Sequence, residues 1–437
     1  IKAEVHNIEH HRSHMASAFF ASPFEESAIL SIDGFGDFTS TMIGTGKGKK
    51  IEVLDSVIYP HSVGVFYTAF TQYLGFENYG DEYKVMGLSP YGKPTLVEKV
   101  KDVIIFKSNG LFEINKKYFK HPKEGVSMSW ENGDPFIESI YSNYMIEVFG
   151  TPRVKGGKLT QYHMDLAASI QKVTEDLIFY ILNHLQRRTG LKNICIAGGV
   201  AQNSVANGKI LDNTSFEEMY IPPAGHDAGT AIGSALWLYN HIQSNDRIKP
   251  MKHSFFGSQF SDKEIEGFLK SENVEYKRYN DSELNDKVSD CLIDAGVVGW
   301  FQGRAEFGPR ALGHRSIIAD PTRGDAKEIL NLKIKRREEF RPFAPSILKE
   351  HVSEYFEKVD EVPFMEKVFQ IKKNKRELLS AVTHVDGSGR LQTVDQNIEP
   401  KYYELIYAFY QKSGIPILLN TSFNENEPIV NTPAEAY

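Results

Sequence analysis

A strand, a glycine turn and a helix in the middle of the chain constrain the fold more than any other feature. Residues 193–197 form a short apolar run that leads directly into Gly198 and Gly199 and then into a helix-like stretch. A long amphipathic helix is expected before it, because between residues 164 and 185 apolar residues recur on one helical face, at Leu166, Ile170, Val173, Leu177 and Ile181. This order predicts an α/β protein, and a glycine turn before a helix is suited to holding phosphate.

The composition changes past the middle of the chain, which predicts two domains. Residues 28–33 and 39–44 read as the two strands of a hairpin near the N-terminal end. The mixed polar segment 245–258 is the best boundary, because the region beyond it is dense in arginine, proline and aromatic residues. We therefore expect domains at 1–250 and 251–437.

Composition narrows the possible partners. The net charge of −7 argues against broad contact with nucleic acid or an anionic membrane, so small molecules are the expected partners. Two cysteines in 437 residues support neither a disulfide framework nor a cysteine metal cluster. No apolar run has the length of a membrane span and no signal peptide is recognisable, so a cytoplasmic location is expected. The chain starts without methionine and Thr432-Pro433 resembles the start of a helix, so we expect a fragment of a longer protein.

Two histidines and two aspartates are candidate metal ligands. His10 and His14 are four residues apart, so on a helix they share one face and suit a single divalent ion. Asp33 and Asp227 each follow a strand or turn beside glycine, where a side chain points into a cleft, and two histidines with carboxylates suit iron or zinc. The alternative is a pair of surface histidines and two aspartates that form turns.

Two stretches of the second domain hold cations among apolar residues. The first contains Arg304, Arg310 and Arg315, and the second contains Lys335, Arg337 and Arg341. Guanidinium groups in an apolar setting need anionic partners, and phosphate is the best geometric match. Nucleic-acid binding and a solvated charge run are the alternatives, which the acidic total and apolar neighbours disfavour. A strand at 418–420 leads into short polar side chains, among them Ser422 and Asn424, which would close over the same anion or simply cap a turn.

Two glycine-containing turns are candidate phosphate contacts. One runs from Asp33 to Thr39, and the other contains Gly198, Gly199 and Asn203. Glycines let backbone N–H groups approach an anion closely. A plain hairpin turn and a plain strand-to-helix turn remain the alternatives.

Long blocks of the sequence resemble the carbamoyltransferase family that includes nodulation-factor and antibiotic O-carbamoyltransferases. The resemblance runs through most of the chain, and its blocks include HHRSHMASAFFASPF, AGGVAQN, FQGRAEFGPRALGHRSIIADP, KRREEFRPFAPSIL, AVTHVDGSGRLQTV and LLNTSFNENEPIV. It implies a first domain like the tRNA threonylcarbamoyl transferases, with an actin-like ATPase fold incomplete at its N-terminus. The second domain would be a twisted-sheet α/β domain similar to the enzyme that makes threonylcarbamoyl-adenylate.

The resemblance also implies a reaction in two steps. Carbamoyl phosphate and ATP would give carbamoyl-adenylate in the second domain, with release of pyrophosphate and phosphate. In the first domain a hydroxyl of a small-molecule or sugar acceptor would then attack the carbamoyl carbon, and AMP would leave. A homodimer is an open possibility, and magnesium is expected with the ATP.

Residue roles follow from the resemblance by position. His10, His14, Asp33 and Asp227 match the metal ligands, with Fe(II) the expected ion and zinc or manganese the alternatives, and His14 is included among the catalytic residues. Gly198, Gly199 and Asn203 match the turn that would hold the adenylate in the first domain. In the second domain two pairs of residues match the adenylate-forming pocket of the family. The first pair is Lys335 and Arg337, and the second is Ser422 and Asn424. Arg310 and Arg341 would neutralise carbamoyl phosphate and the α-phosphate.

One departure and three rivals accompany this interpretation. Family members begin with a further segment of about a hundred residues, which would hold acceptor-site groups and the general base. The rivals are a tRNA threonylcarbamoyl transferase, a hydrogenase-maturation carbamoyltransferase and an actin-like nucleotide-binding protein without carbamoyl chemistry. The first does not need a second arginine-rich domain, and the second normally carries zinc-finger cysteines.

Overall fold

The computed structural model describes residues 4–131, 134–425 and 427–437, which form two compact units. Unit 1 ends at Met251 and unit 2 begins at Lys252, one residue from the expected boundary. Each unit contains a mixed sheet packed against helices, so the α/β class is confirmed. Within the described ranges, none of the helices combines the length and the apolar character that crossing a bilayer requires.

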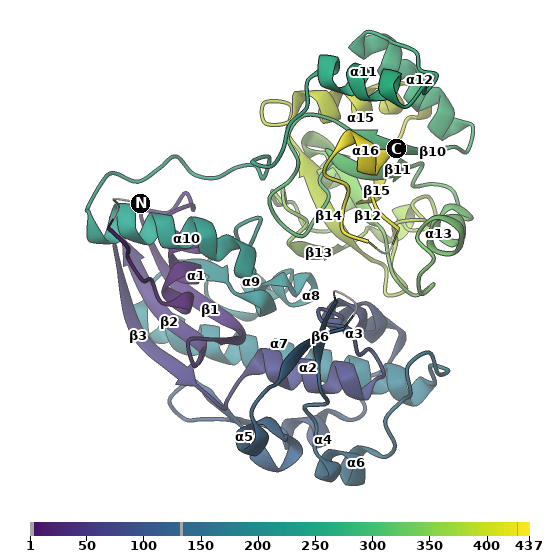
Figure 1. Cartoon of the computed structure of the whole chain (residues 1–437). Helices are drawn as coiled ribbons and strands as arrows, with labels where there is room; N and C mark the ends of the chain where they lie inside the picture. Colours follow the sequence, from purple (N-terminus) through teal and green to yellow (C-terminus); the bar gives the residue numbers. More distant parts are fainter. Residues whose placement is uncertain (1–3, 132–133, 426) are drawn as a thin grey trace. The chain divides into compact units, whose positions relative to one another are not determined.

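Unit 1 is built on a five-stranded sheet in the order β3-β2-β1-β8-β9. Figure 1 labels its first three strands, β3, β2 and β1. The first three strands along the chain are antiparallel, and β8 and β9 continue the sheet in parallel with β1. The predicted hairpin and the predicted strand before the glycine turn are both confirmed. The strands are β1 (Glu26–Gly36), β2 (Thr39–Lys47), β3 (Lys50–Ile58), β8 (Asn193–Ala197) and β9 (Glu218–Tyr220).

Helices cover both faces of this sheet (Figure 1). On one face lie α1 (His10–Phe19) and α10 (Thr230–Leu236), and on the other lie α2 (Val63–Tyr73) and α7 (Gln161–Thr189). The predicted long helix is α7, and it stops where Gly190 adopts a left-handed conformation. Apart from short 3-10 and π-helical turns, the other described elements of unit 1 are α3 (Glu82–Leu88), α4 (Val97–Lys101), α5 (His121–Glu124), α6 (Asn143–Phe149), α8 (Ser204–Asn207), α9 (Ile210–Asn213), β4 (Ile104–Phe106), β5 (Phe112–Ile114), β6 (Met128–Glu131) and β7 (Asp134–Ile137).

The alternation of side chains along β1 decides what faces α1. Ile29 belongs to the apolar core that includes Met15 and Phe19 of α1. Because strand side chains alternate between faces, Ser31 and Asp33 point to the same side as Ile29. A carboxylate is thereby placed under the helix that carries the histidines.

Unit 2 contains a six-stranded sheet in the order β10-β11-β15-β12-β14-β13. Every neighbouring pair is antiparallel except β12 and β14, which are parallel. The strands are β10 (Val297–Phe301), β11 (Arg315–Ala319), β12 (Ala344–Leu348), β13 (Lys367–Gln370), β14 (Ser388–Val394) and β15 (Ile417–Ser422). The helices are α11 (Asp262–Ser271), α12 (Asp281–Ile293), α13 (Ala326–Ile329), α14 (Val352–Tyr355), α15 (Pro400–Ser413) and α16 (Pro433–Ala436).

The two faces of this sheet differ in character. One carries apolar residues such as Ile317, Ile347 and Leu419 into a core. The other is apolar only at one end, where α12 and α15 cover it. Strand register brings polar side chains together over the rest of that second face, at Ser316, Ser346, Ser388, Arg390, Gln392, Asn420 and Ser422. We call this region the polar half of the sheet.

Candidate metal centre and anion site

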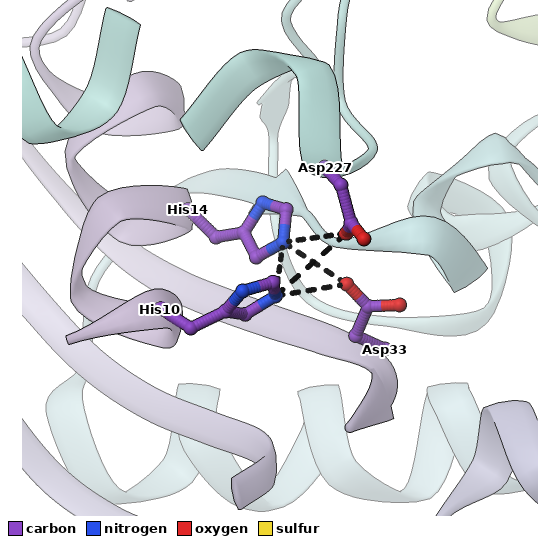
Figure 2. Close-up of side chains that lie close together, drawn as sticks. All are labelled: His10, His14, Asp33 and Asp227. Atoms are coloured by element: carbon purple, nitrogen blue, oxygen red, sulfur yellow. Dashed lines mark hydrogen bonds and ion pairs between the residues drawn. The ribbon is translucent and has the colours of Figure 1, made fainter. Parts of the chain in front are cut away.

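Four side chains from three parts of unit 1 converge on one point (Figure 2). His10 and His14 extend from adjacent turns of α1, as their spacing predicts. Asp33 comes from β1, and Asp227 begins the short 3-10 turn Asp227–Gly229 that leads into α10. The structure therefore brings together the four residues that the sequence singled out as metal ligands.

The ligand atoms have the spacing of a metal site. All four potential ligand atoms lie within 4.8 Å of one another. Asp33 Oδ2 is 3.4 Å from His10 Nε2 and 3.0 Å from His14 Nε2. Asp227 Oδ1 is 3.7 and 3.5 Å from the same two nitrogens, which are 3.0 Å apart. Atoms bound about 2.1 Å from one ion in a tetrahedral arrangement lie about 3.4 Å apart, so the set fits a divalent ion.

Burial within the cluster is graded. The side chain of His14 is completely buried, whereas that of Asp227 is 63% exposed, which leaves an open side. Burial disfavours the charged imidazole of His14, but hydrogen bonds to Asp227 and Asp33 outweigh it and raise its pKa. Burial likewise opposes ionisation of Asp33, yet hydrogen bonds from His10 and His14 lower its pKa. Two carboxylates thus supply the negative charge that a divalent cation would neutralise.

His11 anchors the helix that carries the two histidine ligands. Its Nδ1 lies 2.7 Å from Ser31 Oγ and its Nε2 lies 2.9 Å from the carbonyl oxygen of Thr39. Burial, followed by the nearby His14 and His10, lowers the pKa of His11 to about 4, so the ring is neutral at neutral pH. The middle histidine of the HHRSH motif therefore ties α1 to β1 and β2.

Two glycines permit the close packing around these ligands. A Cβ on Gly36 would lie 2.1 Å from the ring of His10. A Cβ on Gly233 would lie 1.8 Å from the carbonyl oxygen of Ser13, at the point where α10 crosses α1. Glycine lets these backbones approach.

The turn expected to hold adenylate adjoins the four candidate metal ligands. Gly198 has a φ of +100°, and a Cβ there would be 2.1 Å from the carbonyl oxygen of Ile32. A Cβ on Gly199 would be 2.7 Å from Asp33 Oδ1. Asn203, by contrast, is occupied within the chain, because its Oδ1 accepts from the Ala206 N–H and its side chain bonds Gln171. An adenylate contact of these three residues stays a prediction.

In unit 2, Lys335 meets the residues expected to share its pocket. A π-helical turn, Leu330–Ile334, leads into Lys335, whose side chain is buried. Its Nζ donates to the carbonyl and hydroxyl oxygens of Ser422 at 2.8 and 3.2 Å, and to both oxygens of Asn424 at 2.5 Å. The two sequence signatures thus form one contact. Burial and the charges of Arg337 and Arg341 lower the pKa of Lys335 to about 7.

Arg337 and Arg341 act electrostatically on this lysine. Arg337 donates through Nε to Asn331 and lies over the ring of Phe343, and Arg341 pairs with Glu338 at 3.2 Å. Burial lowers the pKa of Arg310 to about 10. We call Lys335, Arg310, Arg337, Arg341 and Arg390 the cationic cluster.

Arg390 was missed by sequence reasoning. Burial and then the charges of Arg310, Arg337 and Arg341 lower its pKa. It lies on β14 within the polar half of the sheet, and its Nε is buried without a hydrogen-bond partner among the described residues. A single arginine in a strand with alternating polar and apolar residues gives no local sign of a binding site. The one available signal is its position in the block AVTHVDGSGRLQTV, which resembles the family.

The loop that carries Arg310 is held over the same polar half. Gln392 donates through Nε2 to the carbonyl oxygen of Leu312 at 2.8 Å, and Asn420 donates through Nδ2 to that of Ala311 at 3.2 Å. These contacts bring the loop with Arg310 over the strand that carries Arg390. Neither guanidinium has a hydrogen bond or ion pair within the described part of the chain.

The expectation that all arginines of the first cationic stretch face an anion is wrong for Arg315. Its guanidinium is buried and donates to four backbone carbonyl oxygens, and it stacks on Phe301 at 3.6 Å. Arg304 is exposed and donates to the carbonyl of Gly257. A guanidinium can be satisfied by carbonyl dipoles as well as by phosphate, and local sequence does not distinguish the two.

Known protein families match both units. Residues 1–236 match the family model for the carbamoyltransferase N-terminus, and residues 289–437 match that for the carbamoyltransferase C-terminus. The chain belongs to the carbamoyltransferase family. Its members are transferase enzymes, so the enzyme class expected from the sequence is confirmed.

Relatives in bacteria extend along nearly the whole chain. An uncharacterised protein of Synechocystis is 43% identical over 98% of this chain and 72% of its own length. The nodulation protein NolNO of Sinorhizobium fredii is 41% identical, and NolO of Bradyrhizobium diazoefficiens is 38% identical, each over 98% of this chain. The matched part is 60% of NolNO and 75% of NolO, so this chain corresponds to part of those proteins.

Solved structures show only a distant likeness. Full-length HypF in a phosphate- and nucleotide-bound form shares 14% identity, and HypF of T. kodakarensis shares 13%. Each match covers 54% of this chain and 36% of that chain, with a TM-score of 0.28. At this level the likeness carries no argument about fold or function.

Proposed function

We propose that this protein is an ATP-dependent O-carbamoyltransferase that makes carbamoyl-adenylate in unit 2 and uses it to carbamoylate a hydroxyl group. The family supports carbamoyl transfer, and the nodulation proteins among its relatives favour a sugar or another small hydroxyl compound as the acceptor. The single observation that carries the adenylate step is the cationic cluster. Arg310 and Arg390 have no acidic partner among the described residues, and unpaired guanidinium groups removed from water are costly unless an anion joins them.

Phosphates suit the cluster better than other anions. Planar guanidinium groups bind phosphate oxygens bidentately, and Lys335 contributes a compact positive charge beside them. Phosphoryl transfer depends mainly on positioning and charge neutralisation, which these side chains supply without acting as nucleophiles. In this proposal Arg310, Arg341 and Arg390 hold carbamoyl phosphate and the α-phosphate of ATP, and Arg337, Ser422 and Asn424 complete the pocket.

The proposed activation has two balanced parts. Water cleaves the phosphate from carbamoyl phosphate and leaves carbamate and inorganic phosphate. A carbamate oxygen then attacks the α-phosphorus of ATP, the bond between that phosphorus and the bridging oxygen breaks, and pyrophosphate leaves with magnesium. The positive charges of Lys335 and the arginines offset the charge that develops on the α-phosphate.

Unit 1 is proposed to carry out the transfer. His10, His14, Asp33 and Asp227 would hold Fe(II), with zinc or manganese as alternatives, and their mixed nitrogen and oxygen ligands suit such ions. The ion would act as a Lewis acid that polarises the carbamoyl carbonyl or the adenylate phosphate. The acceptor oxygen attacks the carbamoyl carbon, the bond to the phosphate oxygen breaks, and AMP departs while the hydroxyl proton passes to a base. The adjoining turn at Gly198 and Gly199 would hold the adenylate.

The test is the dependence of each product on each substrate. The purified protein is incubated with ATP, magnesium and carbamoyl phosphate, and pyrophosphate and inorganic phosphate are measured separately. We expect both to appear together, and neither ATP nor carbamoyl phosphate alone to give pyrophosphate. Pyrophosphate release that needs no carbamoyl phosphate contradicts the proposal. Acceptors are then found by mass spectrometry of extracts, as the mass of a carbamoyl group added to a hydroxyl compound.

A further inference from the structure

His384 stands beside the cationic cluster and has no role in the reaction described so far. It precedes β14 in a tight turn, in which its N–H donates to the carbonyl oxygen of Ser388 at 2.7 Å. Gly387 completes the turn with a φ of +82°. Ser388 and Arg390 lie two residues apart on β14, so their side chains emerge on the same polar half of the sheet. The imidazole that contacts the Ser388 side chain is therefore on the face that carries Arg390.

A short hydrogen-bond relay sets the tautomer of His384. The hydroxyl of Ser388 donates to Asp386 Oδ1 at 2.7 Å. The hydroxyl oxygen, Ser388 Oγ, also lies 3.1 Å from His384 Nδ1. A hydroxyl has one hydrogen, and the carboxylate is the stronger acceptor for it. Nδ1 must then carry the ring hydrogen and donate to Ser388 Oγ. The lone pair of the neutral ring is left on Nε2.

That lone pair is poised to receive a hydrogen bond. Nε2 is buried and has no partner among the residues that the structure describes. Burial lowers the pKa of His384 to about 4, with Arg390 and Lys327 acting in the same direction and Asp386 opposing them. A base this weak is poorly matched to removing protons near neutral pH, so accepting a hydrogen bond is the better use of Nε2.

We propose that His384 Nε2 accepts a hydrogen bond from the amino group of the carbamoyl donor and so selects carbamoyl phosphate over acyl phosphates that lack it. The inference rests on the proposed function. Every member of the cationic cluster is a donor and pairs with the phosphate or carbonyl oxygens of the donor molecule. The amino group is the one part of carbamoyl phosphate that needs an acceptor. Acetyl phosphate places a methyl group there and would leave Nε2 buried and unpaired.

The test compares two ligands of nearly the same shape and charge. Binding of carbamoyl phosphate, acetyl phosphate and inorganic phosphate is measured by calorimetry, for the wild type and for His384→Leu, His384→Gln and Ser388→Ala. We expect the wild type to bind carbamoyl phosphate roughly 10- to 100-fold more tightly than acetyl phosphate, because an unmade buried hydrogen bond costs about that factor. His384→Leu should abolish the preference while acetyl phosphate and inorganic phosphate bind as before.

The other variants separate the contact from a general effect on folding. Glutamine can place a carbonyl oxygen near the position of Nε2, so His384→Gln should keep part of the preference. Ser388→Ala frees the tautomer and should reduce the preference by less than His384→Leu does. His351, which pairs with Glu354, supplies the matched control, and His351→Leu should change neither affinity.

Each result decides between the two levels of the proposal. A His384→Leu protein that still prefers carbamoyl phosphate, or that loses all three ligands equally, overturns the His384 contact. If the wild type binds acetyl phosphate as tightly as carbamoyl phosphate, the His384 contact is also overturned. The adenylate step still stands in that case, provided that pyrophosphate release depends on carbamoyl phosphate. Discrimination in binding without any such pyrophosphate release supports the contact and contradicts the adenylate step.

Discussion

The two units concentrate charge of opposite sign. In unit 1, two carboxylates and two imidazoles converge within 4.8 Å, an arrangement that a cation would stabilise. In unit 2, the pKa values of Lys335, Arg310 and Arg390 are lowered by burial, and for Lys335 and Arg390 also by neighbouring arginines, an arrangement that an anion would stabilise. Uncompensated charge of this kind is common at functional sites, because the ligand supplies what the fold leaves out. Each unit therefore indicates the charge of its ligand.

The clusters also differ in how the protein itself satisfies them. The candidate metal ligands of unit 1 hydrogen-bond one another, so the side chains are held together by their own contacts. In the cationic cluster Lys335 and Arg337 are anchored by oxygens of the chain, whereas the side chains of Arg310 and Arg390 have no hydrogen bond or ion pair among the described residues. Removing a ligand residue should therefore cost function in both units, but only removal of Arg310 or Arg390 should also increase the stability of the fold.

The largest expected effect is that of Lys335→Ala on activation. The change removes the buried ammonium between Ser422 and Asn424, and we expect pyrophosphate release to fall by about 10²–10³-fold. Metal binding, measured by elemental analysis, should not change. Lys333 is exposed and lies two residues away, so Lys333→Ala is the matched control and should keep full release. Equal losses in both variants would contradict the assignment.

His14→Ala tests the other unit. It removes the completely buried ligand, and we expect the affinity for the metal and the rate of transfer to drop at least about 100-fold. Pyrophosphate release should persist, because activation is assigned to unit 2. His6→Ala, on the exposed segment before α1, should change neither property. Loss of both half-reactions in a folded His14→Ala protein would contradict the separation of the two sites.

Arg390→Gln should make the protein more stable and less active. Loss of the guanidinium should weaken inorganic phosphate binding by roughly 10- to 100-fold, as expected for a charged hydrogen bond. Relief of the buried, unpaired charge should raise the free energy of unfolding by about 1–2 kcal/mol. Calorimetric binding and thermal unfolding measure the two effects. Arg336 is exposed and pairs with Glu425, and Arg336→Gln should show neither. A less stable Arg390→Gln would mean that an unseen internal partner holds Arg390.

Gly36→Ala should act on the metal site through packing alone. The added Cβ would lie 2.1 Å from the His10 ring, so the ring must leave its present position among the candidate ligands. We expect metal affinity to fall about 10-fold, a loss typical of disturbed ligand orientation. At Gly34, two residues earlier on β1, a Cβ meets nothing within 4 Å. Gly34→Ala should therefore bind metal normally, and equal effects of the two changes would exclude the packing explanation.

The smallest expected effect is a dependence of anion binding on pH. The pKa of Lys335 is lowered to about 7, and a bound anion should raise this pKa. Just above pH 7, the protein should therefore take up a proton when it binds an anion. Affinity for sulfate, whose own charge is constant there, should thus fall as the pH rises above 7. Calorimetry in buffers of different ionisation enthalpy measures the uptake. It should vanish in Lys335→Met, and an unchanged uptake in that variant would assign the proton to another group.

The same pKa has a consequence for stability. A lysine whose folded pKa is about 7 and whose usual pKa is 10.5 binds more protons in the unfolded chain between those values. Its contribution to the free energy of unfolding therefore rises with pH across this window. The four oxygens around Nζ favour the charged form and work against this trend.

Particular residues show how far sequence reasoning reached. The hairpin of β1 and β2, the long helix α7 and the strand β8 follow from apolar periodicity, which survives in any fold that buries those faces. The meeting of Lys335 with Ser422 and Asn424 was anticipated through family motifs, as was the grouping of His10, His14, Asp33 and Asp227. Arg390 and the His384 relay were missed, because polar residues are common in strands and turns and these carry no local signal of a site. Arg315 was misassigned, because backbone carbonyls are invisible in a sequence.

What the sequence by itself determined is the set of elements, the α/β class, the candidate ligands and the family. These depend on local periodicity, on residues a few positions apart and on long matching motifs. Only the tertiary structure decided that the guanidinium groups of Arg310 and Arg390 have no partner among the described residues, whereas carbonyl oxygens satisfy that of Arg315. It also decided which ring nitrogen of His384 lacks a hydrogen-bond partner. The physical reason is that hydrogen-bond partners and burial are set by residues far apart in the sequence, as when Gln392 on β14 donates to the carbonyl of Leu312, 80 positions away.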